Sequence, residues 1–336
     1  MNFTNKIVRT NNNEVNSLIF SIPANIHIYL GIFLLLMGNI GCFGNLLIYQ
    51  TRTFRHQAFS IYIICETLSD FLVLNFILLT RILENGFHIP LEHSYTFLCK
   101  FREFGEYYFC LCSFTFFTLA SIDRILSAQR SNTFRKWSNR VSLAYKMILI
   151  SILFWFFILF HRFIVFEIID NDCDPTSNLY DIIDHYLEAI LLEIIPLIIV
   201  FILVFLLRRS LKTIVEHQIN IISNKRQQTQ LQNIDSQLTL MLLLQSIIAI
   251  ISFLPYGCRL LYKQILHSYD VTSLYRIIDH IIGALTRVLS FTFFASSFYI
   301  SLISNNGFRR KIKRLFRNNE IRPFVCEPVN ILHNEH

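Results

Sequence analysis

Charged side chains are scarce in this chain of 336 residues. Asp, Glu, Lys and Arg together make up 16% of the sequence, whereas a soluble protein of this size needs roughly a quarter to cover its surface. Apolar residues make up 53%, Phe alone occurs 33 times, and the mean hydropathy is +0.46. The composition therefore excludes an ordinary soluble domain and predicts a polytopic membrane protein.

A cleavable signal peptide is also missing. Residues 1–22 are polar and Asn-rich, so we expect the first apolar run to act as an uncleaved signal-anchor. The net charge of +7 does not form the basic face with interleaved aromatics that nucleic-acid binding requires. Instead, the basic clusters lie between apolar runs or near the C-terminus, which favours anionic lipid and a cytoplasmic protein as partners.

Apolar runs of membrane-spanning length occur seven times. A helix that crosses the ~30 Å hydrocarbon layer needs about 20 mostly apolar residues. The runs cover about 25–50, 59–83, 97–128, 142–166, 183–208, 236–263 and 272–303. We therefore expect an all-α membrane protein, a seven-transmembrane helix bundle over 25–304, after an N-terminal segment of residues 1–24.

Lys and Arg are almost absent from every second connecting segment, which predicts the orientation. If the N-terminus is extracellular, the inner segments 51–58, 129–141, 209–235 and 304–336 carry 17 positive charges. The outer segments carry only Lys6 and Arg9. The sequon Asn2-Phe3-Thr4 is a possible glycosylation site that fits this topology. We expect a multi-pass plasma-membrane protein with a cytoplasmic C-terminus.

Few of the eight cysteines face the oxidising side of the membrane in this topology. Five lie within spans, and Cys326 lies in the inner tail. Only Cys99, at the outer start of span three, and Cys173, in the loop after span four, remain where disulfides persist. We predict a Cys99–Cys173 disulfide; the alternative is two free thiols.

A short basic segment follows span seven. Phe308, Ile312, Leu315 and Phe316 fall on one helical face, with Arg and Lys around the rest. We expect an amphipathic helix over 305–317 that lies on the anionic inner leaflet, followed by a cytoplasmic tail over 318–336. The alternative is a disordered basic tail.

Several motifs recur at the spacing of a known receptor family. Gly44-Asn45 lies in span one, Asp70 lies in span two, and Cys99 precedes Arg124 by 25 residues. Prolines interrupt span five at Pro196 and span six at Pro255. Taken together, the chain resembles the rhodopsin-like (class A) G-protein-coupled receptors over roughly residues 25–317.

Departures from the family pattern mark a divergent member. Ile125 replaces the Tyr that usually follows Asp-Arg, and Phe253 replaces the usual span-six Trp. The span-seven Asn-Pro-x-x-Tyr motif is missing. Its register can be set by Ser297 through Ser301, or by Ser296 and Tyr299.

The resemblance implies a latch at the inner end of the bundle. Arg124, with Asp123 before it, would pair at rest with Asp235 at the inner end of span six. Breaking that pair would let span six swing about Pro255, where a helix hydrogen bond is already lost, and would admit a heterotrimeric G protein. The alternative is that Arg124 snorkels to lipid phosphate.

Asn45, Asp70 and Ser113 lie near the middle of spans one, two and three. In similar receptors these positions line a water and sodium pocket, so a sodium ion is a possible allosteric modulator. Alternatively, Asp70 is protonated and hydrogen-bonded to its neighbours.

The resemblance also places a ligand cavity among spans three, five, six and seven. Glu106 stands where amine receptors hold the acid that pairs with an ammonium group. The expected lining is Glu106, Tyr107, Cys110, Arg102, Phe253 and Tyr256. Alternatively, Arg102, Arg259 or Arg287 neutralises Glu106 internally. The acidic loop after span four would steer a cationic ligand, so a basic or amidated neuropeptide is expected first and a biogenic amine second.

The main alternative is a transporter or channel, but no duplicated halves with paired broken helices are visible. A membrane enzyme would need His clusters or paired catalytic groups inside spans, and we find none, so no enzymatic activity is expected. His88 and His93 lack a third ligand for a metal.

Overall fold

The computed structural model describes residues 21–51, 57–89, 95–129, 140–169, 172–221, 226–266, 273–305, 307–310 and 312. Within these ranges, six helices are long and apolar enough to cross a membrane, and a bent helix pair supplies a seventh crossing if it counts as one span. The expected all-α fold class is confirmed, and the chain is a multi-pass membrane protein. Asn2 and residues 313–336 lie outside the described residues.

The first two spans pack as neighbours. The first contains η1 (Ile26–Gly31) and α2 (Ile32–Tyr49). The second begins with α3 (Ala58–Leu72) and continues through three short segments: η2 (Val73–Leu78), α4 (Leu79–Arg81) and η3 (Ile82–Gly86). The η segments are wide π-type turns, and such turns re-aim the side chains around them.

The third and fourth spans lead into a small hairpin. α6 (Thr96–Ser127) is followed by α8 (Val141–Leu159) and α9 (His161–Val165). The chain then forms the antiparallel strands β1 (Phe166–Ile169) and β2 (Asp172–Pro175), with Ile168 opposite Cys173. The sequence pattern did not predict this hairpin. The Cys99–Cys173 disulfide attaches it to α6.

The fifth and sixth spans are longer than their apolar runs. α10 (Asn178–Glu188) and η4 (Ala189–Ile194) lead into α11 (Ile195–Ile221), and α12 covers Arg226–Leu266. The expected inner segment 209–235 is thus largely helical, because helices continue into water when polar faces can be solvated. Pro196 follows the wide turn of η4, whereas Pro255 lies inside α12.

The seventh span is bent. α13 (Ser273–Ser290) meets α14 (Thr292–Ser304) at an angle of 42°. The Ser290 hydroxyl donates to the Arg287 carbonyl, and the Phe291 N–H donates to the Val288 carbonyl instead of one turn further back. Side-chain back-bonding of this kind bends helices without proline.

A further helical stretch begins after Asn305. The Asn305 carboxamide accepts from the Phe308 N–H at 3.1 Å, as an N-cap does. Residues 307–310 and 312 are helical; Phe308 is buried against Tyr49 and Phe298, and Arg309 and Arg310 are exposed. This agrees with the start of the amphipathic helix expected over 305–317, whose remainder lies outside the described residues.

Aromatic side chains fill the middle of the bundle and also cover its exterior. Phe117, Phe253 and Phe293 pack together in the core. By contrast, Phe157 is 73% exposed and Phe205 is 67% exposed. Apolar residues on the outside are expected where lipid, and not water, is the solvent.

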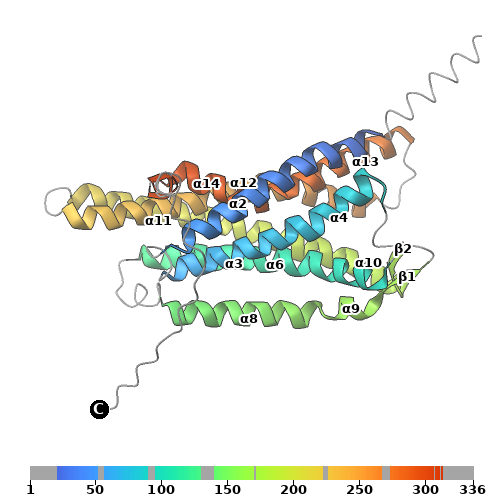
Figure 1. Cartoon of the computed structure of the whole chain (residues 1–336), viewed down its shortest axis with the longest axis horizontal. Helices are drawn as coiled ribbons and strands as arrows, with labels where there is room; N and C mark the ends of the chain where they lie inside the picture. Colours follow the sequence, from blue (N-terminus) through green and yellow to red (C-terminus); the bar gives the residue numbers. More distant parts are fainter. Residues whose placement is uncertain are drawn as a thin grey trace, which may run out of the picture.

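The two ends of the bundle differ in content (Figure 1). The hairpin, α10 and the start of α13 gather at one end, which we call the disulfide end because it holds Cys99 and Cys173. The C-terminal part of α11 extends beyond the other end, which we call the Arg124 end. α6 runs between the two ends.

Candidate functional site

A cavity of about 50 Å³ lies in the half of the bundle nearer the disulfide end. It is lined by residues of four spans: Glu106, Cys110, Leu111, Phe114, Glu188, Leu192, Glu193, Pro196, Phe253, Tyr256, Arg287, Ser290, Phe291 and Phe294. The lining comes from the third, fifth, sixth and seventh spans. Four of the residues predicted as ligand contacts are there, namely Glu106, Cys110, Phe253 and Tyr256.

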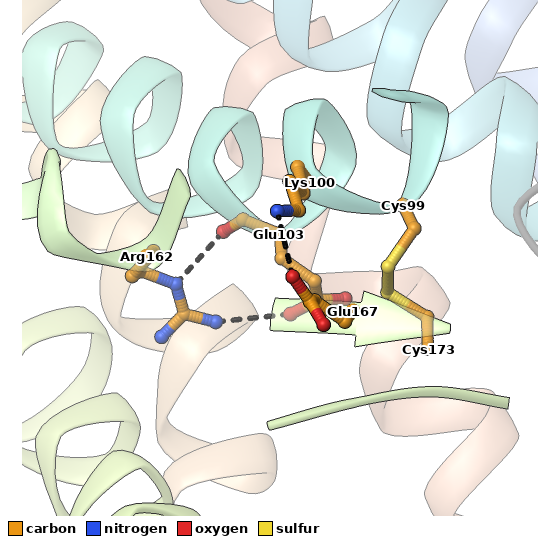
Figure 2. The surroundings of a disulfide bond; sticks show 6 residues. All are labelled: Cys99, Lys100, Glu103, Arg162, Glu167 and Cys173. Carbon is orange, nitrogen blue, oxygen red and sulfur yellow. Dashed lines mark hydrogen bonds and ion pairs between the residues drawn. A yellow bond between two sulfur atoms is a disulfide. The ribbon is translucent and has the colours of Figure 1, made fainter. Parts of the chain in front are cut away.

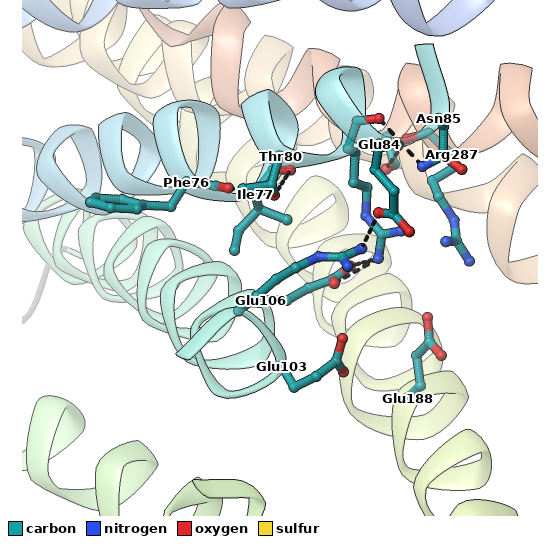
Figure 3. A network of polar contacts seen from close by, with 12 residues as sticks. Phe76, Ile77, Thr80, Glu84, Asn85, Glu103, Glu106, Glu188 and Arg287 are labelled. Atoms are coloured by element: carbon teal, nitrogen blue, oxygen red, sulfur yellow. Dashed lines mark hydrogen bonds and ion pairs between the residues drawn. The ribbon is translucent and has the colours of Figure 1, made fainter. Parts of the chain in front are cut away.

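Glu106 is paired within the protein. Both of its carboxylate oxygens accept from Nη2 of Arg81, at 2.6 and 2.7 Å. The alternative of internal neutralisation therefore describes the geometry, but the partner is Arg81 and not the three arginines considered from the sequence. Figure 3 shows Glu106 reaching from α6 toward the second span, with Glu188 and Arg287 at the right of the view. Arg81 was missed because the sequence does not show which face of the second span meets α6.

Arg102 and Arg259 each have a carboxylate partner of their own. Arg102 pairs with Glu84 at 3.1 Å, so it joins α6 to η3 and does not line the cavity. Arg259 binds Asp279 through two nitrogens, at 3.0 and 3.1 Å. Each pair joins two different elements, which fixes their relative positions.

One tyrosine links three spans at the cavity wall. Arg287 on α13 donates to the Tyr256 hydroxyl at 2.8 Å, and this hydroxyl donates to Glu188 at 3.1 Å. The Arg287 guanidinium also lies 5.3 Å from the Tyr256 ring centroid. The Tyr256 hydroxyl therefore connects the Arg287 guanidinium to the Glu188 carboxylate through two hydrogen bonds.

Arg162 is the centre of a second cluster, at the end of the fourth span. It is 2% exposed, pairs with Glu103 at 2.9 Å and with Asp184, and donates from Nε to the Glu103 carbonyl. Its guanidinium lies 3.7 Å from the ring centroid of Tyr107. Tyr107, predicted as a ligand contact, thus packs against Arg162 and does not line the cavity.

The hairpin is held beside this cluster (Figure 2). The Cys99–Cys173 disulfide links it covalently to α6, and Lys100 pairs with Glu167 at 3.4 Å. Not all acids of this region face solvent, since Asp184 is buried against Arg162. Burial also raises the pKa of the nearby Tyr180 hydroxyl to about 12, so this side chain is neutral at physiological pH.

Within the described residues, the carboxyl groups in the middle of the bundle bond to neutral side chains. Ser113 donates to Asp70, and Asn45 donates to the Ser297 hydroxyl at 3.1 Å. Gln245 on α12 donates to Glu66 on α3 at 2.5 Å. Sequence reading missed Glu66, although a carboxylate one helical turn before Asp70 was a visible signal.

Span seven shows which serines face the bundle. Ser297 accepts from Asn45, and the Ser301 hydroxyl contacts Met241 of α12 at 2.9 Å. The Ser296 hydroxyl instead bonds to the Phe293 carbonyl in its own helix, and Tyr299 donates to the Met37 carbonyl. Of the two registers left open by the sequence, the one with Ser297 and Ser301 turns toward the core.

Arg124 lies at the opposite end from the cavity and is 5% exposed. It binds the carboxylate of Asp123 at 2.6 Å, and its guanidinium lies 5.0 Å from the Phe59 ring centroid. Asp235 lies in the first part of α12, but its side chain is outside the described residues. The pairing of Asp235 with Arg124 therefore stays a prediction.

No protein-family model matches the chain, and no curated protein matches it in sequence. It is a multi-pass helical membrane protein. No group of three or more His, Cys, Asp or Glu suited to a metal occurs within the described residues. A functional assignment has to be argued from the cavity, the two charged clusters and Arg124.

Proposed function

We propose that the protein is a rhodopsin-like G-protein-coupled receptor, which binds an extracellular ligand in the cavity and activates a heterotrimeric G protein at the Arg124 end. One observation carries this proposal: the same two helices serve both ends. α6 carries Glu106 at the cavity and Arg124 at the other end, and α12 carries Tyr256 at the cavity and Asp235 at the other end. A ligand that shifts either helix is thereby coupled to the G-protein side.

α12 is the moving element in this proposal. Pro255 has no N–H, so the Ile251 carbonyl loses its helix partner and the helix is softened beside the cavity. Asp235 completes a latch with Asp123 and Arg124, and its release lets the end of α12 move outward. The expected change is a population shift between two states.

The latch is tested by Asp235→Ala. Basal signalling should rise several-fold at equal surface expression, because the resting state loses an ion pair of about 1–2 kcal/mol. Asp174→Ala, an exposed acid of the hairpin, is the matched control. Unchanged or lower basal signalling in Asp235→Ala would refute the latch.

The receptor function is tested by a panel of basic and amidated peptides and of biogenic amines. Cells expressing the chain with a promiscuous Gα are read by calcium, with surface expression measured in parallel. A neuropeptide is the favoured ligand and an amine the second. Silence across a broad panel with normal surface expression counts against a ligand-gated receptor.

The orientation belongs to the same proposal: extracellular N-terminus, cytoplasmic C-terminus, plasma membrane. The 17 positive charges in alternate segments support it. Protease protection of an epitope at residue 1 should show cleavage from outside intact cells. Protection there would overturn the orientation and the function together.

Sodium fits the polar middle of the bundle as a modulator. Asp70, Ser113 and Asn45 would hold it, since hard cations prefer carboxylate, hydroxyl and amide oxygens, and the Asn45 carboxamide oxygen has no hydrogen-bond partner among the described residues. A sodium titration of the melting temperature, with potassium as control, tests this. Equal stabilisation by both ions contradicts it.

Transport is the second candidate function, favoured by Glu66 and Asp70. Two buried carboxyls one turn apart in a membrane helix are common on ion pathways. Flux of sodium or protons into proteoliposomes distinguishes this candidate, because a receptor conducts neither.

A further inference from the structure

Three carboxyl side chains line the cavity, and two of them are matched by internal cations. Glu106 has Arg81, and Glu188 has Arg287 through the Tyr256 hydroxyl. The third is Glu193, in the wide turn of η4 just before Pro196. Among the described residues of the cavity wall, Glu193 is therefore the carboxyl that no arginine matches, directly or through Tyr256.

Glu193 is buried but incompletely partnered. The residue is 4% exposed, and its Oε2 atom has no hydrogen-bond partner among the described residues. A buried carboxyl in this condition is destabilising unless a partner arrives, because its desolvation is not offset. Unsatisfied groups of this kind in a cavity wall point to a ligand contact.

The neighbouring helix leaves room for this carboxyl. A Cβ added at Gly257 on α12 would lie 3.2 Å from the Glu193 Oε2 atom. That separation is tighter than an ordinary van der Waals contact, so any larger residue at 257 would push the carboxyl away. Glycine at this position lets the Oε2 atom lie close to the backbone of α12.

Aromatic side chains form the apolar part of the wall. Phe114, Phe253, Phe291 and Phe294 line the same cavity as Glu193. The cavity leaves about 50 Å³ of free space, enough for a few water-sized groups, so a larger ligand group enters by displacing some of these rings. The wall therefore offers one carboxyl and a ring-lined space together.

We propose that Glu193, and not Glu106, binds the cationic group of the ligand, and that the phenylalanine wall receives an aromatic or aliphatic group attached to it. This rests on the proposed receptor function. Glu106 is the weaker site because a ligand cation there has to compete with Arg81, which already contacts both carboxylate oxygens. The shared ligand chemistry is an ammonium or guanidinium beside a ring, which a monoamine or a basic peptide end supplies.

The test is the melting temperature of the purified full-length protein in detergent with two matched probe pairs. 2-Phenylethylammonium is compared with neutral N-acetyl-2-phenylethylamine, and N-acetyl-Arg-Phe-amide with N-acetyl-citrulline-Phe-amide, which has no cationic group. The first pair represents the amine source and the second the peptide source. Probes at about 10 mM detect dissociation constants in the millimolar range.

We expect at least one cationic probe to raise the melting temperature while its neutral counterpart does not. Glu193→Gln should weaken binding of that probe at least tenfold, while Asp174→Asn, an exposed acid on the hairpin, keeps wild-type binding. Gly257→Ala should weaken it by a smaller factor. Equal binding by wild type and Glu193→Gln, or stabilisation by neither cation in wild type, overturns the proposal.

A ligand-free comparison separates a binding role from a structural one. Glu193→Gln should leave the melting temperature of the empty protein unchanged or higher, because no partner is lost. Glu106→Gln should lower it, because Arg81 loses its carboxylate. If Glu193→Gln lowers it as much as Glu106→Gln, Glu193 is a structural group and the proposal fails.

These measurements need no G protein, so the two proposals fail separately. Charge-selective probe binding without any cellular signal contradicts the receptor function and leaves the Glu193 site standing. A cellular response that survives in Glu193→Gln leaves the receptor function standing and removes the site.

Discussion

Buried carboxyl groups have different kinds of partner at the disulfide end and in the middle of the bundle. At the disulfide end, Glu103, Glu106 and Asp184 each have an arginine within ion-pair distance. In the middle, Glu66 accepts from a glutamine amide and Asp70 accepts from a serine hydroxyl. The acids at the disulfide end are thus held by ion pairs, and those in the middle by neutral hydrogen-bond donors.

Because the partners differ, substitutions in the two regions should change the free energy of unfolding by different amounts. Removing one member of a buried ion pair leaves the other charge stranded, which costs about 3–5 kcal/mol. Removing the charge from a carboxyl that already has a neutral partner costs much less, because the hydrogen bond survives.

Arg162→Met should be the most damaging change. It strands Glu103 and Asp184 and removes the cation from the Tyr107 ring, so we expect a loss of about 3–5 kcal/mol and poor surface expression. Lys100→Met, which breaks only the exposed pair with Glu167, should cost less than about 1 kcal/mol. Melting temperatures of both proteins check this. Similar values for the two variants would contradict a central role of Arg162.

Arg81→Met tests whether the Glu106 pair behaves as a unit. The single variant should lose about 3 kcal/mol because the Glu106 carboxylate is stranded, and the double variant Arg81→Met with Glu106→Gln should recover most of it. A double-mutant cycle on thermal unfolding gives the coupling. Strictly additive losses would show that the two side chains act independently.

Opening the Cys99–Cys173 disulfide should lower stability by about 2–4 kcal/mol, because a long loop is released in the unfolded chain. Cys99→Ser with Cys173→Ser is compared with Cys65→Ser, which removes a thiol inside the second span. The melting temperature should fall only in the first protein. A fall of the same size with Cys65→Ser would mean that thiol loss, and not the cross-link, is responsible.

Glu66→Gln should be the mildest change, within about 1 kcal/mol of wild type. The amide oxygen that replaces the carboxylate still accepts from Gln245, so the link between α3 and α12 persists. Glu66→Leu, which has no acceptor, is the comparison and should be clearly less stable. If Glu66→Gln is as harmful as Glu106→Gln, the middle of the bundle depends on charge after all.

The sequence was informative about elements and poor about partners. The apolar runs predicted the spans, and elimination of the cysteines in spans and tail pointed to Cys99 and Cys173, which are bonded in the structure. The partner of Glu106 was not predictable, because run length does not give a helix's rotation about its axis. Arg81 and Arg102 both fit the outer half by depth, and only packing shows that Arg81 reaches Glu106.

The sequence also did not reveal that Glu193 lacks a partner for one of its carboxylate oxygens. As an isolated acid near the start of an apolar run, it resembles the end of a span, and nothing nearby in sequence distinguishes it from Glu188. The structure separates the two, because Tyr256 reaches Glu188 and no described residue bonds to the Glu193 Oε2 atom. The hairpin was missed for a similar reason, since four-residue strands carry too little periodicity to be recognised.

The glycines of the first span have a consequence for how the bundle can rearrange. A methyl group at Gly41 would lie 3.2 Å from the Cβ of Phe298, and one at Gly44 would overlap its ring, so α2 and α14 lie in near backbone contact. Separating them would lose this close packing, because glycine has no side chain that could follow Phe298. We therefore expect α2 and α14 to keep their relative positions when α12 moves.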